Sequence, residues 1–243
     1  MDAIRIQNLT KKYRAKTVLK KINLTIPKGQ TVALLGSNGS GKTTFFKLLV
    51  GLQRPNNGTI QLIKIDPSIL DISSEIAGRQ ISLQEIAFLP DESFLQPKMN
   101  VKEMVHYYGS FFNDFDQKKM QNLLLFMELR STEKISELSN GMKRRLELAL
   151  ILARNASLIL LDEPFNIIDL LSREKILQAI IKEHRFGEST LIIATHLVDE
   201  IENLVERAIF LKKNVIAADI DLEEWKLRHN LSLKDMYCEV VQS

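Results

Sequence analysis

Thr31-Val-Ala-Leu-Leu35, followed at once by Gly36-Ser-Asn-Gly-Ser-Gly41-Lys42-Thr43, is the stretch that decides the fold. The first five residues form a continuous apolar run, which is typical of a strand buried on both faces. The next eight fit the pattern G-x-x-x-x-G-K-[ST] at every fixed position. Residues 43–50 then have helical character. A buried strand, a glycine loop and a helix in this order predict a loop that binds phosphate.

The composition of this phosphate loop, residues 36–43, suits an anion. Glycine tolerates the backbone shapes that point N–H groups at phosphate oxygens, and the following helix N-terminus adds partial positive charge. Lys42 is expected to reach the β- and γ-phosphates, and the Thr43 hydroxyl to ligate Mg²⁺. The alternative is a plain glycine turn with a surface lysine. The full set of expected ATP contacts here is Ser37, Asn38, Gly39, Ser40, Gly41, Lys42, Thr43 and Thr44.

Two acids follow a second apolar run, in Leu158-Ile-Leu-Leu161-Asp162-Glu163-Pro164. Ligands of open α/β sheets bind outside the carboxyl ends of the strands. Asp162 is expected to hold Mg²⁺ through water. Glu163 is expected to orient or deprotonate an attacking water. The alternative for this acid pair is a strand-to-loop turn with solvated carboxylates.

Composition limits the class of protein. The 243 residues are 45% hydrophobic and 26% charged, which excludes a disordered chain and a collagen. A net charge of +3 is too small to indicate a nucleic acid as the main partner. Cys238 is the single cysteine, so no internal disulfide is expected and a reducing compartment fits.

Membrane insertion is not expected. The longest stretch without Asp, Glu, Lys or Arg is residues 29–41, which is 13 residues, whereas a spanning helix needs roughly 20. The first residues show no secretory signal pattern, and no internal repeat is visible.

Periodicity divides the chain into β-rich and helical parts. Residues 4–6, 22–26 and 59–65 are strand candidates, whereas residues 101–112 and 117–129 have helical spacing. Asn100 and Glu103 resemble a capping box in front of the first of these helices.

The last third alternates between strands and helices, which predicts a parallel, helix-covered sheet. Strands are expected at 158–161 and 190–194, helices near 171–184 and 197–205, and a mostly helical tail at 219–243.

The ordered motifs together resemble the ATP-binding subunit of an ABC transporter. Leu138-Ser139-Asn140-Gly141-Met142 is similar to the family signature, and Asp169 matches the aspartate of the D-loop. Thr195-His196 matches the switch histidine, and Tyr13 matches the aromatic residue that stacks on adenine. Over nearly the whole chain, these motifs follow the family's order.

The resemblance implies an α/β fold. It has a P-loop NTPase core with a mostly parallel sheet, an N-terminal antiparallel β portion and an inserted α-helical subdomain. Residues 1–95 would form the first part of the ATP-binding core, with the phosphate loop. Residues 96–155 would form the helical subdomain with the signature, 156–218 the second part of the core, and 219–243 a C-terminal helical tail.

The resemblance also assigns roles. Lys42, Glu163 and His196 would be catalytic. ATP would further contact Tyr13, Ser139, Gly141 and Asp169, with the signature facing the ATP of a second subunit. Mg²⁺ would be held by Thr43, Asp162 and Asp91. Ser139 also reads as a simple helix N-cap.

Several positions depart from the family pattern. Asp91 stands where the family usually has glutamine, and a carboxylate lacks the amide donor. Asn140 and Met142 stand where many members have Gly and Gln. The D-loop, Phe165-Asn-Ile-Ile-Asp169, lacks the usual small residues. The Leu-Pro-Asp and Leu-Ser-x-Gly-Met-Lys patterns, and the ending Ser232-Leu-Lys-Asp-Met-Tyr-Cys-Glu-Val-Val, resemble the type-2 export branch.

The implied partner is a separate six-helix permease, which places this chain in the cytoplasm on the inner face of the cell membrane. The working pair of ATP-binding subunits is either a homodimer or a hetero-pair, and no nucleic acid is expected. Phe94, Leu95, Phe111 and Phe112 lie in the segment expected to meet the permease, although most of them are expected to be core.

Two alternatives remain at this point. A soluble ABC-type ATPase of translation or DNA repair usually has a second cassette or a long coiled coil, but Lys42 and Ser139 are only 97 positions apart. A nucleotide sensor that does not hydrolyse ATP would lack the catalytic residues, whereas Glu163 and His196 are both present. The departure at Asp91 keeps this second alternative open.

Overall fold

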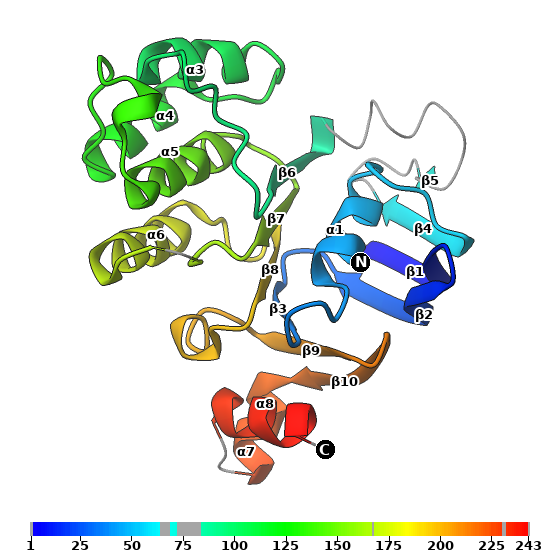
Figure 1. Cartoon of the computed structure of the whole chain (residues 1–243). Coiled ribbons are helices and arrows are strands. Elements are labelled where there is room, and N and C mark those ends of the chain that lie inside the picture. Colours follow the sequence, from blue (N-terminus) through cyan, green and yellow to red (C-terminus); the bar gives the residue numbers. More distant parts are fainter. Residues whose placement is uncertain (1, 64–68, 72–83, 167, 230–231, 243) are drawn as a thin grey trace.

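The computed structural model describes residues 2–63, 69–71, 84–166, 168–229 and 232–242. The described strands form two sheets (Figure 1). The four-stranded sheet has the order β2 (Lys16–Pro27), β1 (Asp2–Tyr13), β4 (Asn57–Ile63) and β5 (Ile69–Asp71). The six-stranded sheet has the order β10 (Val215–Asp221), β9 (Arg207–Lys212), β3 (Thr31–Leu35), β8 (Thr190–Thr195), β7 (Leu158–Asp162) and β6 (Ile86–Leu89).

Strand direction differs between the two sheets. Neighbours in the four-stranded sheet pair antiparallel. In the six-stranded sheet, β6, β7, β8, β3 and β9 pair parallel, and β10 pairs antiparallel with β9. The mostly parallel core and the N-terminal antiparallel portion are therefore as predicted, and the carboxyl ends of β3, β7 and β8 meet at one edge.

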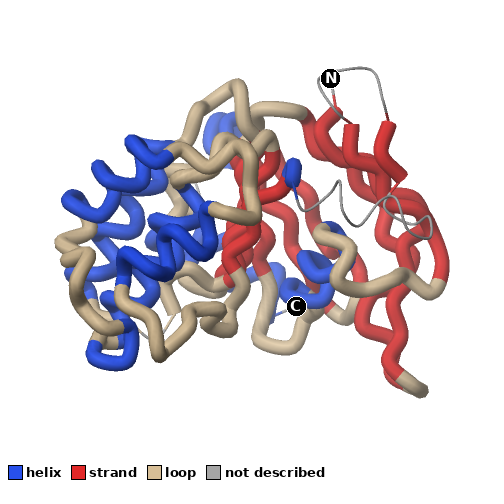
Figure 2. The backbone as a smooth tube through the Cα atoms, turned by 90° about the horizontal axis from the view of Figure 1, so that it is seen from above, coloured by secondary structure: helices blue, strands red, loops and turns tan. Residues whose placement is uncertain are grey.

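The helices between residues 101 and 183 gather on the side opposite the antiparallel sheet (Figure 2). α1 (Lys42–Leu49) follows β3 and lies between the two sheets (Figure 1). The others are α3 (Val101–Gly109), α4 (Gln117–Phe126), α5 (Asn140–Leu152), α6 (Leu170–Glu183), α7 (Leu222–His229) and α8 (Leu233–Gln242), with short 3₁₀ turns at Ile135–Glu137 and Val198–Glu200. None of the described helices has the length and apolar character needed to cross a membrane.

The core consists of two apolar clusters, one on each face of the six-stranded sheet. Val32 and Leu34 of β3 pack into the cluster shared with α1 and the antiparallel sheet. Ala33 and Leu35 pack into the cluster shared with α3, α4, α5 and α6. This alternation explains why β3 is a continuous apolar run and confirms that it is buried on both faces.

The capping box at the start of α3 is also confirmed. The Asn100 side chain accepts a hydrogen bond from the backbone N–H of Glu103 at 2.9 Å, and the Glu103 carboxylate accepts one from the N–H of Asn100 at 2.9 Å. Two unpaired N–H groups of the helix start are thereby satisfied.

The last third differs from expectation in two places. The helix expected near 197–205 is a 3₁₀ turn, Val198–Glu200, followed by further turns. The apolar residues Val198, Ile201 and Leu204 are still buried, but they are held by bonds between residues three apart, such as Leu204 N–H to Ile201 O at 2.9 Å.

The second difference is the hairpin of β9 and β10, which the periodicity did not indicate. β10 takes up the first residues of the segment expected to be a helical tail, because its side chains alternate between exposed and half-buried positions along a sheet edge. α7 and α8 then form the rest, and residues 230–231 and 243 lie outside the described residues.

His184, at the end of α6, is buried, and no acidic side chain among the described residues favours its protonation. Its Nε2 lies 3.1 Å from the Thr31 hydroxyl, and its Nδ1 lies 3.2 Å from the Ser189 hydroxyl. Burial, aided by the positive charges of Arg185 and Lys119, lowers the pKa of His184 to about 4. The folded protein therefore holds this ring neutral at pH values where the unfolded chain protonates it.

This difference predicts a pH-dependent stability. The unfolded chain binds the extra proton below its pKa of about 6.5, so the free energy of unfolding should fall as pH drops from about 6.5 toward about 4. Between about pH 7 and about pH 5, the free energy of unfolding of His184→Asn should fall by roughly 1 kcal/mol less than that of wild type, allowing for partial solvent screening. Urea unfolding at each pH measures this free energy. His106→Asn, at an exposed histidine, is the control and should keep the wild-type profile. Identical profiles for wild type and His184→Asn would contradict the assignment.

Candidate functional site

The phosphate loop connects the carboxyl end of β3 to the start of α1. Gly41 caps α1 with φ of +110°, a backbone conformation that side chains with a Cβ rarely adopt. The N–H of Phe45 donates to the Gly41 carbonyl at 2.8 Å, and the N–H of Ser40 donates to the Ser37 carbonyl at 3.1 Å. The loop therefore has the compact backbone that the glycine spacing predicted.

A cleft of about 420 Å³ opens beside this loop. Among the predicted residues, it is lined by Asn38, Gly39, Gly41, Lys42, Thr43 and Thr44, and also by Asp91 and Glu163. The hydroxyl oxygen of Ser40 is buried and has no hydrogen-bond partner among the described residues. A buried hydroxyl of this kind is available to a polar ligand, as the anion-binding role requires.

Lys42 joins the phosphate loop to the acid pair. Its side chain is only 6% exposed, and its Nζ donates to the Gly36 carbonyl at 2.8 Å. The same Nζ lies 3.2 Å from Oε1 of Glu163, at the end of β7. This distance confirms that the loop and the acid pair converge on one cleft.

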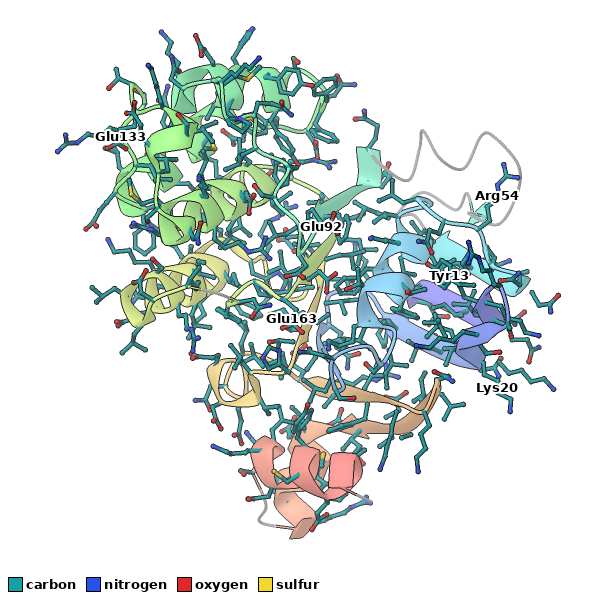
Figure 3. All side chains as sticks on the ribbon, viewed as in Figure 1. Tyr13, Lys20, Arg54, Glu92, Glu133 and Glu163 are labelled. Atoms are coloured by element: carbon teal, nitrogen blue, oxygen red, sulfur yellow. The ribbon has the colours of Figure 1, made fainter. Side chains whose placement is uncertain are left out.

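Glu163 is held in an unusual backbone conformation. Its φ is +46°, which for a residue with a Cβ costs roughly 1–2 kcal/mol. Its N–H donates to the Ala194 carbonyl of β8 at 2.8 Å. Its Oε2 lies 3.0 Å from Nδ1 of His196, two residues further along the chain from Ala194. The turn thus directs the carboxylate between Lys42 and His196, near the centre of the molecule (Figure 3).

Asp162 is fully buried beside Glu163. Burial, together with the nearby carboxylates of Asp91 and Glu163, raises its pKa to about 6, although the Thr43 hydroxyl and Lys42 oppose this shift. Neither carboxylate oxygen accepts a well-formed hydrogen bond from a described residue. A buried carboxylate without donors next to a hydroxyl suits a hard cation such as Mg²⁺, which prefers oxygen ligands.

Asp91 is exposed and lines the same cleft. It also lines a second cavity of about 250 Å³, whose walls include Lys143 and Glu147 of α5 together with Glu163. Asp91 therefore lies where the acid pair faces the helical part of the chain.

Ser139, Gly141 and Asp169 form a second group, and none of them lines the cleft of the phosphate loop. The Ser139 hydroxyl accepts from the N–H of Met142 at 3.2 Å, which confirms that Ser139 caps α5. Asp169 caps α6 by accepting from the N–H of Ser172 at 2.9 Å, and it also accepts from the Ser172 hydroxyl at 2.8 Å. These two hydrogen bonds lower the pKa of Asp169.

Gly141 brings the starts of α5 and α6 into contact. A Cβ on this residue would lie 2.5 Å from the Ser172 hydroxyl and 2.7 Å from Oδ2 of Asp169. A side chain at this position would therefore require the Ser172 hydroxyl and the Asp169 carboxylate to move. Ile167 of the predicted D-loop lies outside the described residues.

Tyr13 lies apart from both groups, over the antiparallel sheet (Figure 3). Tyr13 is 42% exposed, its hydroxyl is hydrogen-bonded to Gln53, and the Lys11 ammonium lies 5.1 Å from the ring centre. The exposed ring is open to a flat ligand, but Tyr13 does not line the cleft. Its role in adenine stacking stays a prediction.

Two residues of the site were not predicted from the sequence. Asn166 lines both cavities. Arg144 is 7% exposed and donates to the backbone carbonyls of the acid pair. The sequence contained a signal for the burial of Arg144. This residue lies three and four positions before Glu147 and Leu148, on the buried face of α5.

Comparison with known proteins adds independent evidence. A family model described as ABC transporter matches residues 19–166. The ABC transporter ATP-binding protein YtrB of Bacillus subtilis (strain 168) is 33% identical over 223 residues, which cover 92% of this chain and 73% of that protein. The Nod factor export ATP-binding protein I of Burkholderia lata is 29% identical, over 98% of this chain and 75% of the relative.

Solved structures agree on the fold. An ATP-binding subunit of an ABC transporter superposes with a TM-score of 0.82 at 21% identity, over 98% of this chain and 99% of that chain. The ATP-binding cassette MJ0796, in a dimeric post-hydrolysis state bound to ADP and phosphate, superposes with a TM-score of 0.77 at 26% identity, over 90% and 98% of the two chains. The predicted combination of a mostly parallel core, an antiparallel portion and helices is therefore that of these cassettes.

Proposed function

Because this chain belongs to the ABC transporter family, we propose that it powers the export of a substrate through a separate transmembrane permease. The chain is an ATP-binding and ATP-hydrolysing subunit of an ABC transporter. Export is favoured by the motifs of the type-2 branch and by a relative named for Nod factor export. The observation that carries the enzymatic part is that Lys42 and His196 both contact the Glu163 carboxylate, at 3.2 and 3.0 Å.

The chemistry would be an in-line attack of water on the γ-phosphate of ATP. The backbone N–H groups of the phosphate loop and the Lys42 ammonium would hold the phosphates and offset their charge. Glu163 would accept a proton from the attacking water at its carboxylate. His196, whose Nδ1 is already 3.0 Å from that carboxylate, would keep the carboxylate in position beside the attacking water. The strained backbone of Glu163 supports this role, since such strain clusters at functional sites.

Thr43 would hold Mg²⁺ directly, and Asp162 and Asp91 would hold it through water. The buried carboxylate of Asp162, which has no well-formed hydrogen bond, supports this assignment. The ion would neutralise charge on the phosphate oxygens. The chain's own contribution is to bring these oxygen ligands beside the phosphate loop, at the carboxyl ends of β3 and β7.

The working form would be a pair of cassettes arranged head to tail. In this arrangement Ser139 and Gly141 of one cassette would complete the ATP site of the other, and the N-terminus of α5 would favour the negative phosphate. This explains why neither residue lines the cleft of its own chain. The cassette MJ0796, which is dimeric after hydrolysis, supports the pairing.

Replacing Ser139 by Arg should therefore impair turnover and ATP-driven dimerisation together, because a bulky cation would sit between the two cassettes. Steady-state ATPase activity and size-exclusion chromatography with ATP measure the two effects, each expected to fall at least about 10-fold. Ser110→Arg, on an exposed serine at the end of α3, is the matched control. A change confined to the ATP affinity of the monomer would contradict the arrangement.

Tyr107 and Phe111 are the aromatic residues best placed to meet a permease. Both are exposed, and their rings pack edge to face at 5.0 Å. Leu95, in contrast, is buried in the core, and Phe94 and Phe112 are half-buried. An exposed aromatic pair of this kind is typical of a contact surface.

The permease proposal is tested by purifying the tagged chain from detergent-solubilised membranes of the producing cell. One polypeptide with about six spanning segments should co-purify and raise the ATPase activity. Phe111→Asp should lose this polypeptide and keep the basal activity of the isolated chain. A chain that carries full activity alone and does not bind a membrane protein would overturn the proposal.

A further inference from the structure

Arg144 of α5 is one of the few buried cations, and its guanidinium group is fully engaged. An arginine has five N–H donors in one plane, and each donor here has an acceptor. Nη1 donates to the Pro90 carbonyl at 2.7 Å and to Oε2 of Glu147 at 3.1 Å. Nε donates to the Pro164 carbonyl at 3.4 Å. One side chain thereby connects α5 to the segment after β6 and to the turn after β7.

The remaining two donors, both on Nη2, bind the backbone of the acid pair. They reach the carbonyl of Asp162 at 2.7 Å and the carbonyl of Glu163 at 3.0 Å. These two carbonyls belong to the peptide planes on either side of the Glu163 Cα. Fixing both planes fixes φ and ψ of Glu163, because no other backbone torsion lies between them.

The backbone of Glu163 needs such a restraint. Its φ of +46° is disfavoured for a residue with a Cβ and persists only where the surroundings over-determine it. The N–H of Glu163 donates to the Ala194 carbonyl at 2.8 Å, which restrains the preceding peptide plane, and the Glu163 carbonyl accepts from the N–H of Asn166 at 3.2 Å. Arg144 adds a shorter bond to that carbonyl, and its guanidinium group binds both planes at once.

We propose that Arg144 is a positioning residue for ATP hydrolysis, which holds the turn that directs the Glu163 carboxylate at the attacking water. The inference rests on the proposed role of Glu163 as the base. Arg144 touches neither phosphate nor water in this role; it acts through the backbone of Glu163. Because Arg144 lies five residues after Ser139 on the same helix, it also connects the signature to the acid pair.

The test is Arg144→Lys, which keeps the charge but has three donors on a tetrahedral nitrogen and cannot bind five acceptors in a plane. The kcat should fall about 10- to 100-fold, whereas the Kd for a fluorescent ATP analogue should change less than about 2-fold. If the lysine variant does not fold, Arg144→Gln is the second variant. It too should lower kcat and leave the Kd for the ATP analogue nearly unchanged.

Two neighbouring arginines serve as controls. Arg145 donates to the Met127 carbonyl at 2.6 Å, away from the acid pair, so Arg145→Lys should keep its kcat. Arg154 is as buried as Arg144 and donates to the Ile86 carbonyl at 2.6 Å. Arg154→Lys should lower the Tm without a matching loss of kcat. An equal loss of kcat in Arg154→Lys would mean that stability alone is responsible, and would overturn the proposal.

A double variant separates this inference from the function on which it rests. In the Glu163→Gln background, Arg144→Lys should cause no further loss of kcat, since the group it positions is already gone. A further 10-fold loss there, or a normal kcat in Arg144→Lys alone, would overturn the positioning role. Undiminished turnover in Glu163→Gln alone would instead overturn the role of Glu163.

Discussion

Glu163→Gln is expected to slow ATP hydrolysis at least about 100-fold while preserving ATP binding. The amide keeps the size of the side chain but cannot take up a proton from water at neutral pH. The substitution also removes the negative charge that faces the Lys42 ammonium at 3.2 Å, so this lysine is free to bind phosphate. Phosphate release measures turnover, and size-exclusion chromatography with ATP should reveal a trapped dimer.

The matched control for this variant is Glu92→Gln. Glu92 is an exposed acid beside Asp91 and lines neither of the two cavities. It should keep wild-type turnover. Turnover in Glu163→Gln equal to that of wild type would refute Glu163 as the base.

Lys42→Ala is expected to weaken ATP binding at least about 100-fold, because a buried ammonium next to the phosphates contributes charge-assisted hydrogen bonds. The effect has a second source in this structure. Once Lys42 is gone, the buried Glu163 carboxylate has lost its nearest cation and would repel the γ-phosphate. Calorimetric titration with ATP measures the loss.

A double variant separates these two causes of weaker ATP binding. Lys42→Ala combined with Glu163→Gln should recover part of the ATP affinity, because the repelling carboxylate is absent. Lys47→Ala, in the last turn of the same helix, should leave the affinity unchanged. An ATP affinity equal to that of wild type in Lys42→Ala would contradict the assignment of the phosphate loop.

Much of this fold follows from local pattern. The apolar run at 31–35 and the glycine loop after it define a strand, a tight turn and a helix, whose dihedral preferences are local. The convergence of Lys42 and Glu163 was also predictable, because parallel strands end at a common edge. Ser139 and Asp169 are exposed and do not line the cleft of the phosphate loop. This fits the family resemblance, which no single-chain pattern would have indicated.

The parts that were missed depend on tertiary contacts. The β9–β10 hairpin has short apolar runs whose pairing depends on β3, some 170 positions earlier in the chain. The positive φ of Glu163 depends on bonds from Ala194 and Arg144, which come from other elements. The segment after His196 has apolar residues at helical spacing, yet packing favours turns.

The tight packing of Gly141 against Asp169 and Ser172 has a consequence for how two cassettes would work together. Asp169 follows Glu163 by only six positions, and it touches the very helix start that would face the neighbouring cassette's ATP. Occupancy of one site would therefore alter the geometry offered to the other through this close contact. The pair should show positive cooperativity, with a Hill coefficient for ATP hydrolysis above one, and enlarging residue 141 to alanine should reduce that cooperativity.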